Sequence, residues 1–432
     1  MIKKSAIIFI SILLLILFHS AIGIEQKSSI NENNQMEFSC FDSNVPKMIN
    51  TVNRSILFGY LEKIVSFGVR YVGSENVSRA SEYINAEFQS LGLDSYIDYW
   101  KFPKFKCQNV IGIINGTDTS SDAVIVLTAH LDTTKKSIGA NDDGSGVATI
   151  LTIANICSKY SFNHTIKFVI VSGEEEGLYG SFDYAEKAYF RNENIIANIN
   201  LDTIGNSTCG NVIQAQQPDR SKWLFDYTKE LNQKYDEFID IRVQLDQYFP
   251  DDSQSFIDYG YDTISFVQPK VIEYPFHTPE DTLDKIDYKY YENVTKIMLA
   301  LTAELANKEI NLQVRFETPM EGYIYIFNRP LLKLPGFNLI RTRFRAMTYL
   351  IGRPIAKINI TTDEEISTVT YSIDGIMNLY GIFTKPPYDW KIQKNPMLLY
   401  RLKGIHKVGV LVTTISGKTA YDEMDFYAIT RI

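Results

Sequence analysis

Apolar and polar residues follow two different patterns along this chain, and the pattern changes near residue 309. Between residues 45 and 308, segments with apolar residues at helical spacing alternate with short runs rich in β-branched residues. The runs predict strands at 96–102, 110–115, 123–131, 166–171, 195–201 and 263–267. The other segments predict helices at 46–67, 76–91, 145–160, 181–191, 221–235, 253–259 and 288–307. Such alternation indicates an α/β fold, a three-layer sandwich with a mostly parallel central sheet between helices.

Residues 309–432 carry short strand patterns separated by turn residues, without a strong amphipathic helix. The predicted strands are 313–317, 323–327, 356–361, 368–373, 408–414 and 423–429. Strands at this spacing are typical of an all-β sandwich. We therefore expect an α/β domain at 45–308 followed by a β-sandwich domain at 309–432.

The N-terminus has the pattern of an export signal. Lys3 and Lys4 precede an apolar run over 6–18, and small residues follow at Ala21 and Gly23. The run is shorter than the roughly 20 residues that span a bilayer. We expect a signal peptide at 1–23, a flexible lead-in at 24–44, and a mature chain that is secreted or held at the cell surface. A retained N-terminal anchor is the alternative.

Composition narrows the class of partner. The chain has 432 residues, 45% of them hydrophobic and 22% charged, which is ordinary for a soluble globular protein. A net charge of -8 disfavours nucleic acid as a partner, because that affinity comes from Lys and Arg. The four cysteines are Cys40, Cys107, Cys157 and Cys209, none in CxxC spacing. Export would permit disulfides, and the pairing stays open.

Polar residues that can bind metal lie at the ends of the predicted strands. His130, Glu174, Glu175 and Asp202 each end a strand or follow one closely. The carboxyl ends of parallel strands meet at one edge of a sheet, where ligands bind in α/β folds. Each residue alone has a structural interpretation, since GEEEG can be a solvated loop and Asp202 a turn residue. Their joint placement favours a metal site.

Two further motifs complete the donor set, NDDGSG at 141–146 and FHTPEDT at 276–282. Asp142 and Asp143 could instead cap a helix that begins near Ser145. Zinc takes imidazole and carboxylate ligands, and two zinc ions can share the two oxygens of one carboxylate. A carboxylate that is not a ligand can act as a general base.

The resemblance to a known family is carried by several motifs together. These are VLTAHLDTT (126–134), GANDDGSGVA (139–148), VSGEEEGLYGS (171–181), NINLDTIG (198–205) and FHTPEDTLDKID (276–287). Over 45–308 the sequence resembles the exported di-zinc aminopeptidases, relatives of the transferrin-receptor and glutamate-carboxypeptidase ectodomains. The resemblance implies that Asp142 bridges two zinc ions. It implies that His130 and Asp202 complete one zinc site, and Glu175 and His277 the other.

The same resemblance implies roles outside the ligand set. Glu174 would be the general base, and Asp132 would hydrogen-bond the far imidazole nitrogen of His130. Asp252 matches an acidic position of the family with a structural role. Phe276 departs from the pattern, because many relatives have a Tyr there whose hydroxyl steadies the tetrahedral intermediate. Tyr274 is nearby, but nothing in the sequence shows that it substitutes.

The implied activity is removal of N-terminal residues from peptide substrates. Segments 318–330, 367–375 and 386–391 resemble Ig-like modules of exported microbial proteins, which could contact cell wall, other surface proteins or nothing. Tyr388 and Trp390 in the last segment are expected to be packing residues. A glutaminyl-peptide cyclase with one zinc is the nearest alternative, and a carboxypeptidase for acidic dipeptides is another. A non-catalytic surface protein is the third alternative, although no ligand is missing here.

Overall fold

The structure is a computed structural model, and it describes residues 44–429 with several gaps. The residues outside the description are 1–43, 120, 192, 208, 219–220, 248, 309–311, 321, 334–336, 340–341, 345–347, 363, 394–403, 416–418 and 430–432. The predicted signal peptide and, except for Asn44, the predicted lead-in lie outside the described residues. Among the described helices, none has the length and apolar character needed to cross a membrane.

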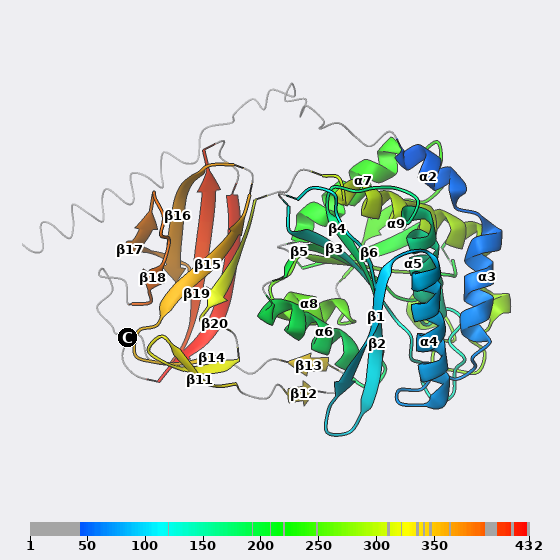
Figure 1. Cartoon of the computed structure of the whole chain (residues 1–432), viewed down its shortest axis with the longest axis horizontal. Helices are drawn as coiled ribbons and strands as arrows, with labels where there is room; N and C mark the ends of the chain where they lie inside the picture. The colour runs from blue at the N-terminus through cyan, green and yellow to red at the C-terminus, as the bar shows by residue number, and fades with distance from the viewer. Residues whose placement is uncertain are drawn as a thin grey trace, which may run out of the picture. The chain divides into compact units, whose positions relative to one another are not determined.

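A mixed sheet forms the centre of the α/β part (Figure 1). It has eight strands in the order β1-β2-β4-β3-β5-β8-β6-β7. The strands are β1 Asp94–Lys101, β2 Lys106–Ile114, β3 Ala123–His130, β4 Thr165–Val171, β5 Asn194–Leu201, β6 Val212–Gln216, β7 Arg242–Leu245 and β8 Thr263–Val267. The neighbours β4, β3, β5 and β8 are parallel to one another. Antiparallel pairs flank them, β1 with β2, β2 with β4 and β6 with β8. The predicted α/β class with a parallel centre is confirmed, and β6 and β7 are strands that the sequence pattern did not predict.

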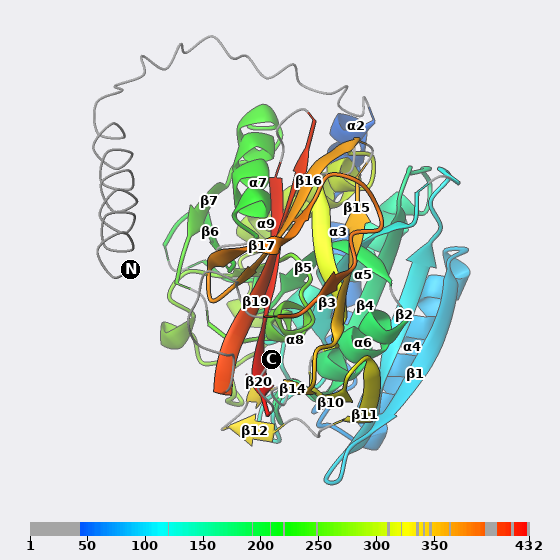
Figure 2. The ribbon, with the colours of Figure 1, turned by 90° about the vertical axis from the view of Figure 1, so that its left-hand side faces the viewer.

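Helices pack in two groups, and both groups contact the sheet (Figures 1 and 2). The helices are α2 Val45–Thr51, α3 Arg54–Val65, α4 Glu75–Ser90, α5 Gly144–Cys157, α6 Tyr179–Phe190, α7 Lys222–Lys234, α8 Ser253–Asp258 and α9 Tyr288–Leu305. One group joins α2, α3, α4, α5, α7 and α9 through mutual contacts, and the other joins α6 and α8. The helix predicted over 46–67 is two helices, because Asn53 leaves helical geometry and its side chain accepts a hydrogen bond from the Ile56 N–H to begin α3.

The centre of the sheet is buried on both faces, as expected of central parallel strands. Every residue of β3 and β5 is buried. Phe168 of β4 is fully buried and stacks on Phe88 of α4, with ring centroids 6.0 Å apart. Gly112 of β2 lies beneath Phe88, and a Cβ there would come within 2.7 Å of the ring. The glycine therefore lets α4 approach the sheet closely.

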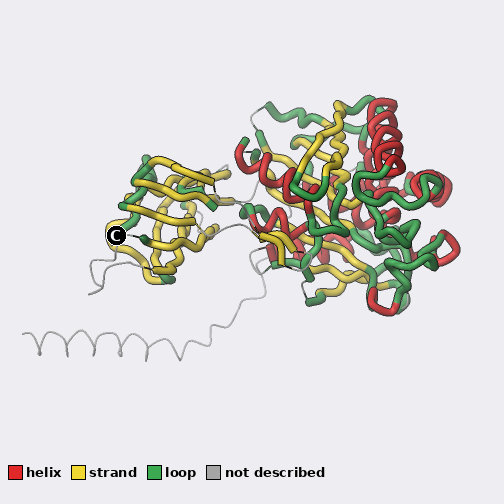
Figure 3. Tube along the Cα trace, turned by 90° about the horizontal axis from the view of Figure 1, so that it is seen from below, coloured by secondary structure: helices red, strands yellow, loops and turns green. Residues whose placement is uncertain are grey.

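The C-terminal part is all-β in its described residues (Figure 3). Its strands are β9 Gln313–Thr318, β10 Tyr323–Ile326, β11 Arg329–Lys333, β12 Phe337–Leu339, β13 Thr342–Phe344, β14 Thr348–Ile351, β15 Ile355–Thr361, β16 Ile366–Ile373, β17 Ile376–Phe383, β18 Trp390–Lys391, β19 Gly404–Thr414 and β20 Thr419–Ala428. They form a seven-stranded sheet β11-β10-β14-β20-β19-β16-β17, a three-stranded sheet β18-β15-β9 and the pair β12-β13. The predicted all-β class is confirmed.

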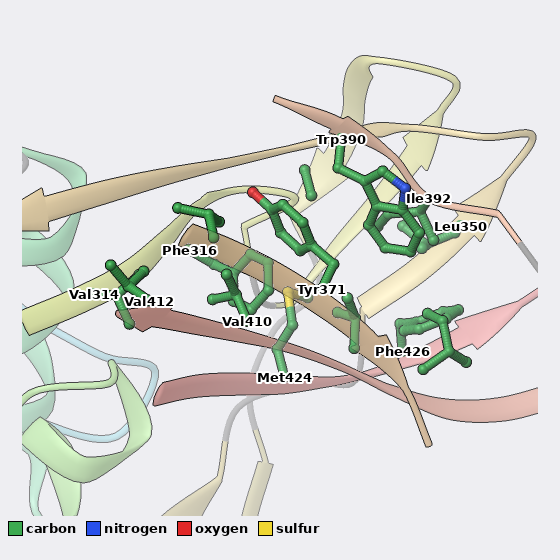
Figure 4. Packing of buried hydrophobic residues seen from close by; sticks show 14 of the residues in the cluster. Val314, Phe316, Leu350, Tyr371, Trp390, Ile392, Val410, Val412, Met424 and Phe426 are labelled. Carbon is green, nitrogen blue, oxygen red and sulfur yellow. The ribbon is translucent and has the colours of Figure 1, made fainter. Parts of the chain in front are cut away.

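Side chains from the seven-stranded and three-stranded sheets share one apolar core (Figure 4). Tyr371 of β16 stacks on Trp390 of β18, with centroids 5.0 Å apart and planes 23° apart. Trp390 is buried, and Tyr388 packs against the same cluster. Both aromatic residues are therefore packing residues, as predicted.

Two details of organisation bear on the sequence predictions. Helix α9 ends at Leu305 and β9 begins at Gln313, while the domain limits 45–308 and 309–432 stay predictions. Cys107 and Cys157 are buried free thiols, and Cys40 lies outside the described residues. Neither Cys107 nor Cys157 therefore contributes a disulfide to the fold.

Phe168→Ala should lower the free energy of unfolding by about 3–5 kcal/mol, because it removes a buried ring and leaves a cavity against Phe88. Urea unfolding followed by fluorescence measures this change. Tyr99→Ala is the matched control, since Tyr99 is 72% exposed on β1 and its loss should cost less than about 1 kcal/mol. Equal stability losses in the two variants would contradict the assignment of Phe168 to the core.

Candidate metal centre

The predicted site residues lie at the carboxyl ends of the parallel strands. His130 is the last residue of β3, and Asp202 directly follows β5. Glu174 and Glu175 lie in the loop after β4. His277 lies in the segment after β8, between the 3-10 turns η2 Val271–Glu273 and η3 Leu283–Lys285. The parallel sheet thus brings four separate segments to one edge.

Asp142 lies just before α5 and is shared by two groups of side chains. Its Oδ1 lies 3.1 Å from Nε2 of His130, and Oδ1 of Asp202 lies 3.8 Å from the same nitrogen. Its Oδ2 lies 3.2 Å from Nε2 of His277, which is 2.9 Å from Oε2 of Glu175. One carboxylate therefore presents one oxygen to each group, which is the geometry that a bridging ligand requires.

The residues present fit a metal centre. Ligand atoms within each of the two groups all lie within 4.8 Å of one another. Nε2 of His130 is buried and makes no hydrogen bond of normal geometry among the described residues. Imidazole with carboxylate oxygens is a donor set that zinc prefers. The structure thus brings together all five residues predicted as ligands.

Asp143 orients the backbone around the centre. Its Oδ1 accepts hydrogen bonds from the N–H of Gly146 at 2.9 Å and of Thr203 at 3.2 Å, and its Oδ2 accepts from the N–H of His130 at 3.2 Å. The adjacent acids therefore divide two functions: Asp143 caps α5, and Asp142 faces the histidines. A Cβ on Gly146 would come within 2.5 Å of the Leu201 carbonyl oxygen, so this close approach of helix and strand requires glycine.

Asp132 makes a different contact from the one expected. Its carboxylate lies 3.9 Å from Nδ1 of His130, beyond hydrogen-bond distance, and its backbone oxygen accepts from Nδ1 at 3.0 Å. The carboxylate instead accepts from the N–H groups of Gly173 at 2.6 Å, Glu174 at 3.2 Å and Glu175 at 3.3 Å. Asp132 thus orients His130 through its carbonyl oxygen, and its side chain positions the loop that carries Glu174 and Glu175.

Glu174 lies beside the two ligand groups but belongs to neither. Burial raises the pKa of Glu174 well above its ordinary value, against the opposing attraction of His130. Burial also raises the pKa of Asp252, to about 7. A carboxylate whose proton affinity is raised in this way is suited to accept a proton in catalysis.

The Tyr that many relatives place before the last histidine has no substitute in Tyr274. Its hydroxyl is buried and donates to Oδ1 of Asp281 at 2.7 Å. The ring of Phe276 packs edge-on against His277, with centroids 4.5 Å apart. The hydroxyl of Tyr274 therefore forms its hydrogen bond within the loop that carries His277.

Arg70 supports the site, although the sequence pattern did not predict this role. It is fully buried, and its guanidinium donates to the carbonyl oxygens of Leu131 at 2.8 Å, Ile138 at 2.8 Å and Gly139 at 3.1 Å. These bonds hold the loop between His130 and Asp142. The only sequence signal is FGVRYVG at 67–73, which does not reveal that the arginine is buried.

Opposing effects set the protonation of the histidines. Burial alone would lower the pKa of His277, but hydrogen bonds to Asp142 and Glu175 outweigh it and raise that pKa to about 9. Burial would likewise lower the pKa of His130, and the carboxylates of Asp142 and Asp202 raise it. Both histidines of the centre therefore hold protons that a metal ion must displace.

Comparison with known proteins gives a family, relatives and a shared fold. Residues 109–302 match the family model of peptidase family M28. Aminopeptidase YwaD of Bacillus subtilis is 28% identical over 214 residues, which cover 47% of this chain and 45% of that protein. A probable zinc metalloprotease of Leptosphaeria maculans is 28% identical over 195 residues, 39% of this chain and 45% of that protein. The chain thus spans less than half the length of these curated relatives. The crystal structure of LapB from Legionella pneumophila, 23% identical with a TM-score of 0.57, covers 62% of this chain and 76% of its own and shares the fold.

The zinc affinity of the centre should depend on pH in a direction set by His277. Zinc must displace a proton from a group with a pKa of about 9, so apparent affinity should fall about tenfold or more per pH unit below that value. Chelator-competition titrations between pH 6 and 8.5 measure this slope. Because the pKa is raised from 6.5 in the folded chain, His277 should stabilise the metal-free protein below about pH 6.5 and lose that effect as pH rises through about 9. A zinc affinity that does not change between pH 6 and 8.5 would contradict the conclusion that His130 and His277 hold protons in the metal-free protein.

Proposed function

We propose that the chain is a secreted zinc aminopeptidase that removes N-terminal residues from peptides. The match of residues 109–302 to the family model of peptidase family M28 supports the reaction class. The observation that carries the proposal is the pair of ligand groups that share Asp142. The relatives named as an aminopeptidase and as a zinc metalloprotease support the reaction class and the metal.

The proposed cofactor is two zinc ions bridged by Asp142. His130 and Asp202 would hold one ion, and Glu175 and His277 the other. The support is geometric, because the two oxygens of Asp142 face different imidazoles at 3.1 and 3.2 Å. This arrangement favours the two-metal peptidase over a cyclase with a single zinc.

Zinc bound at this centre would act as a Lewis acid toward the scissile carbonyl and would lower the pKa of a water molecule. Glu174 takes the proton that the attacking water loses. The carbon–nitrogen bond of the substrate amide then breaks, and Glu174 returns the proton to the leaving nitrogen. Asp132 holds the backbone of Glu174 in place through the hydrogen bond at 3.2 Å, so the base does not swing away.

Location and attachment are part of the proposal. The basic and apolar segment at 1–23 supports export, with the mature chain secreted or at the cell surface. The C-terminal β-sandwich, with its likeness to Ig-like modules, would provide contact with the cell surface or cell wall. Peptides remain the proposed substrates, and nucleic acid is not a proposed partner.

The function is tested with purified protein on a panel of aminoacyl chromogenic substrates, with and without chelator. We expect hydrolysis that chelation abolishes and zinc restores, with metal content near two per chain. Ring closure of an N-terminal glutamine with one zinc would favour the cyclase. Cleavage only at a C-terminal acidic residue would favour the carboxypeptidase. An inactive protein whose cellular role survives His130→Ala combined with His277→Ala would favour the non-catalytic surface protein.

Glu174→Gln should retain both zinc ions and lose about 10²–10⁴-fold in kcat, because the amide cannot accept the proton from water. Steady-state kinetics with parallel metal analysis measures both quantities. Glu176→Gln is the matched control in the same loop, and it should keep kcat within a few-fold. Retained kcat in Glu174→Gln would show that another group is the base.

A further inference from the structure

Asp281 connects two loops of the metal centre, the one that carries His277 and the one that carries Asp142. It lies four positions after His277, in the same segment, and it is fully buried. Its Oδ1 accepts a hydrogen bond from the N–H of Asn141 at 2.9 Å, and its Oδ2 accepts one from the N–H of Asp142 at 3.1 Å. The carboxylate thus holds two consecutive peptide groups of the loop that presents Asp142.

The bonds of Asp281 restrain Asp142 in a way that no other described side chain duplicates. Asp143 anchors the backbone on the far side of Asp142, toward His130 and α5. Asp281 anchors the N–H groups of Asn141 and Asp142 to the segment that carries His277. Asn141 is held in addition by its own side chain, whose Oδ1 accepts from the N–H of Gly205 at 2.7 Å. The N–H of Asp142 is therefore bonded to Asp281, while the side chain of the next residue, Asp143, is bonded to the backbone of His130 and of α5.

Tyr274 completes the environment of Asp281. Its hydroxyl donates to Oδ1 at 2.7 Å, so this oxygen accepts from both Asn141 and Tyr274. An ionised carboxylate only accepts hydrogen bonds, and it can satisfy three donors at once. An asparagine in its place has one acceptor oxygen and would turn an N–H donor toward one of these donors. The surroundings of residue 281 therefore favour a carboxylate over an amide. None of the three donors belongs to the side chain of a proposed metal ligand.

We propose that Asp281 is a positioning residue that fixes the bridging carboxylate of Asp142 relative to His277. It would thereby set the affinity of the centre for the metal ion that Glu175 and His277 would hold. This inference rests on the proposed zinc function, because it concerns how the donors are held for that metal. Partners that orient ligands in this way typically change metal affinity by about 10–100-fold when they are replaced.

Asp281→Asn in the full chain tests the inference, with zinc itself as the probe. Competition titration against a chelator should show at least about tenfold weaker binding of one of the two ions. Glu280→Gln is the matched control, because Glu280 is the exposed neighbour of Asp281 and should leave both affinities unchanged. Unchanged zinc affinity in Asp281→Asn would overturn the inference. Weaker folding of the metal-free protein with unchanged zinc affinity would also overturn it, because that pattern denotes a structural role alone.

Tyr274→Phe keeps the inference testable if Asp281→Asn does not fold. This variant removes one hydrogen bond and retains both bonds from Asp281 to the backbone, so zinc binding should weaken by about twofold to fivefold. The rise in melting temperature that zinc produces should shrink accordingly. If Asp281→Asn does not fold, an unchanged affinity in Tyr274→Phe overturns the proposal. A wild-type chain that binds two zinc ions without hydrolysing peptides would refute the proposed function and leave this inference standing.

Discussion

Burial of several carboxylates at one edge of a parallel sheet is the constraint on which the rest of the centre depends. Burial raises the pKa of Glu174 and Glu175, and neighbouring acids raise both further, so the acids resist ionisation together. Arg70 and the two imidazoles offset part of this repulsion, and backbone N–H groups offset more. A pair of divalent cations would neutralise what is left. The hydrogen bonds around the acids therefore hold an arrangement that is unfavourable without a cation.

The sequence predicted the fold best where packing is strongest. The central strands were placed within one or two residues, because their runs are rich in buried apolar and β-branched residues. Strands β6 and β7 were missed, since they are short and carry polar residues at the sheet margin. Strand β17 was missed although Asp374 and Gly375 carry the Asp-Gly signal of a tight hairpin. Their φ values of 52° and 74° are those that such a turn requires.

The side chains that meet at the centre were predictable, whereas the atoms that hold them were not. Metal chemistry restricts ligands to few residue types, so strand ends indicated a metal site at His130, Glu175 and Asp202, and the family resemblance implied the full set with Asp142 and His277. Their catalytic roles remain predictions. The contact of Asp132 differed because its nearest donors are backbone N–H groups, which have no signature in the sequence. The same reason hid the roles of Arg70 and Asp281, whose side chains bond to backbone groups and to one tyrosine hydroxyl.

The donors that face Asp142 are widely separated along the chain. His130, Asp142 and Asp202 precede the last donor, His277, by a long stretch that includes β6, β7, α7 and β8. Proteins are made from the N-terminus, and contacts between distant residues form late in folding. A nascent chain therefore carries every donor of the first group while the second still lacks its imidazole. The two proposed halves of the centre would therefore gain their full sets of donors one after the other, in the order of translation.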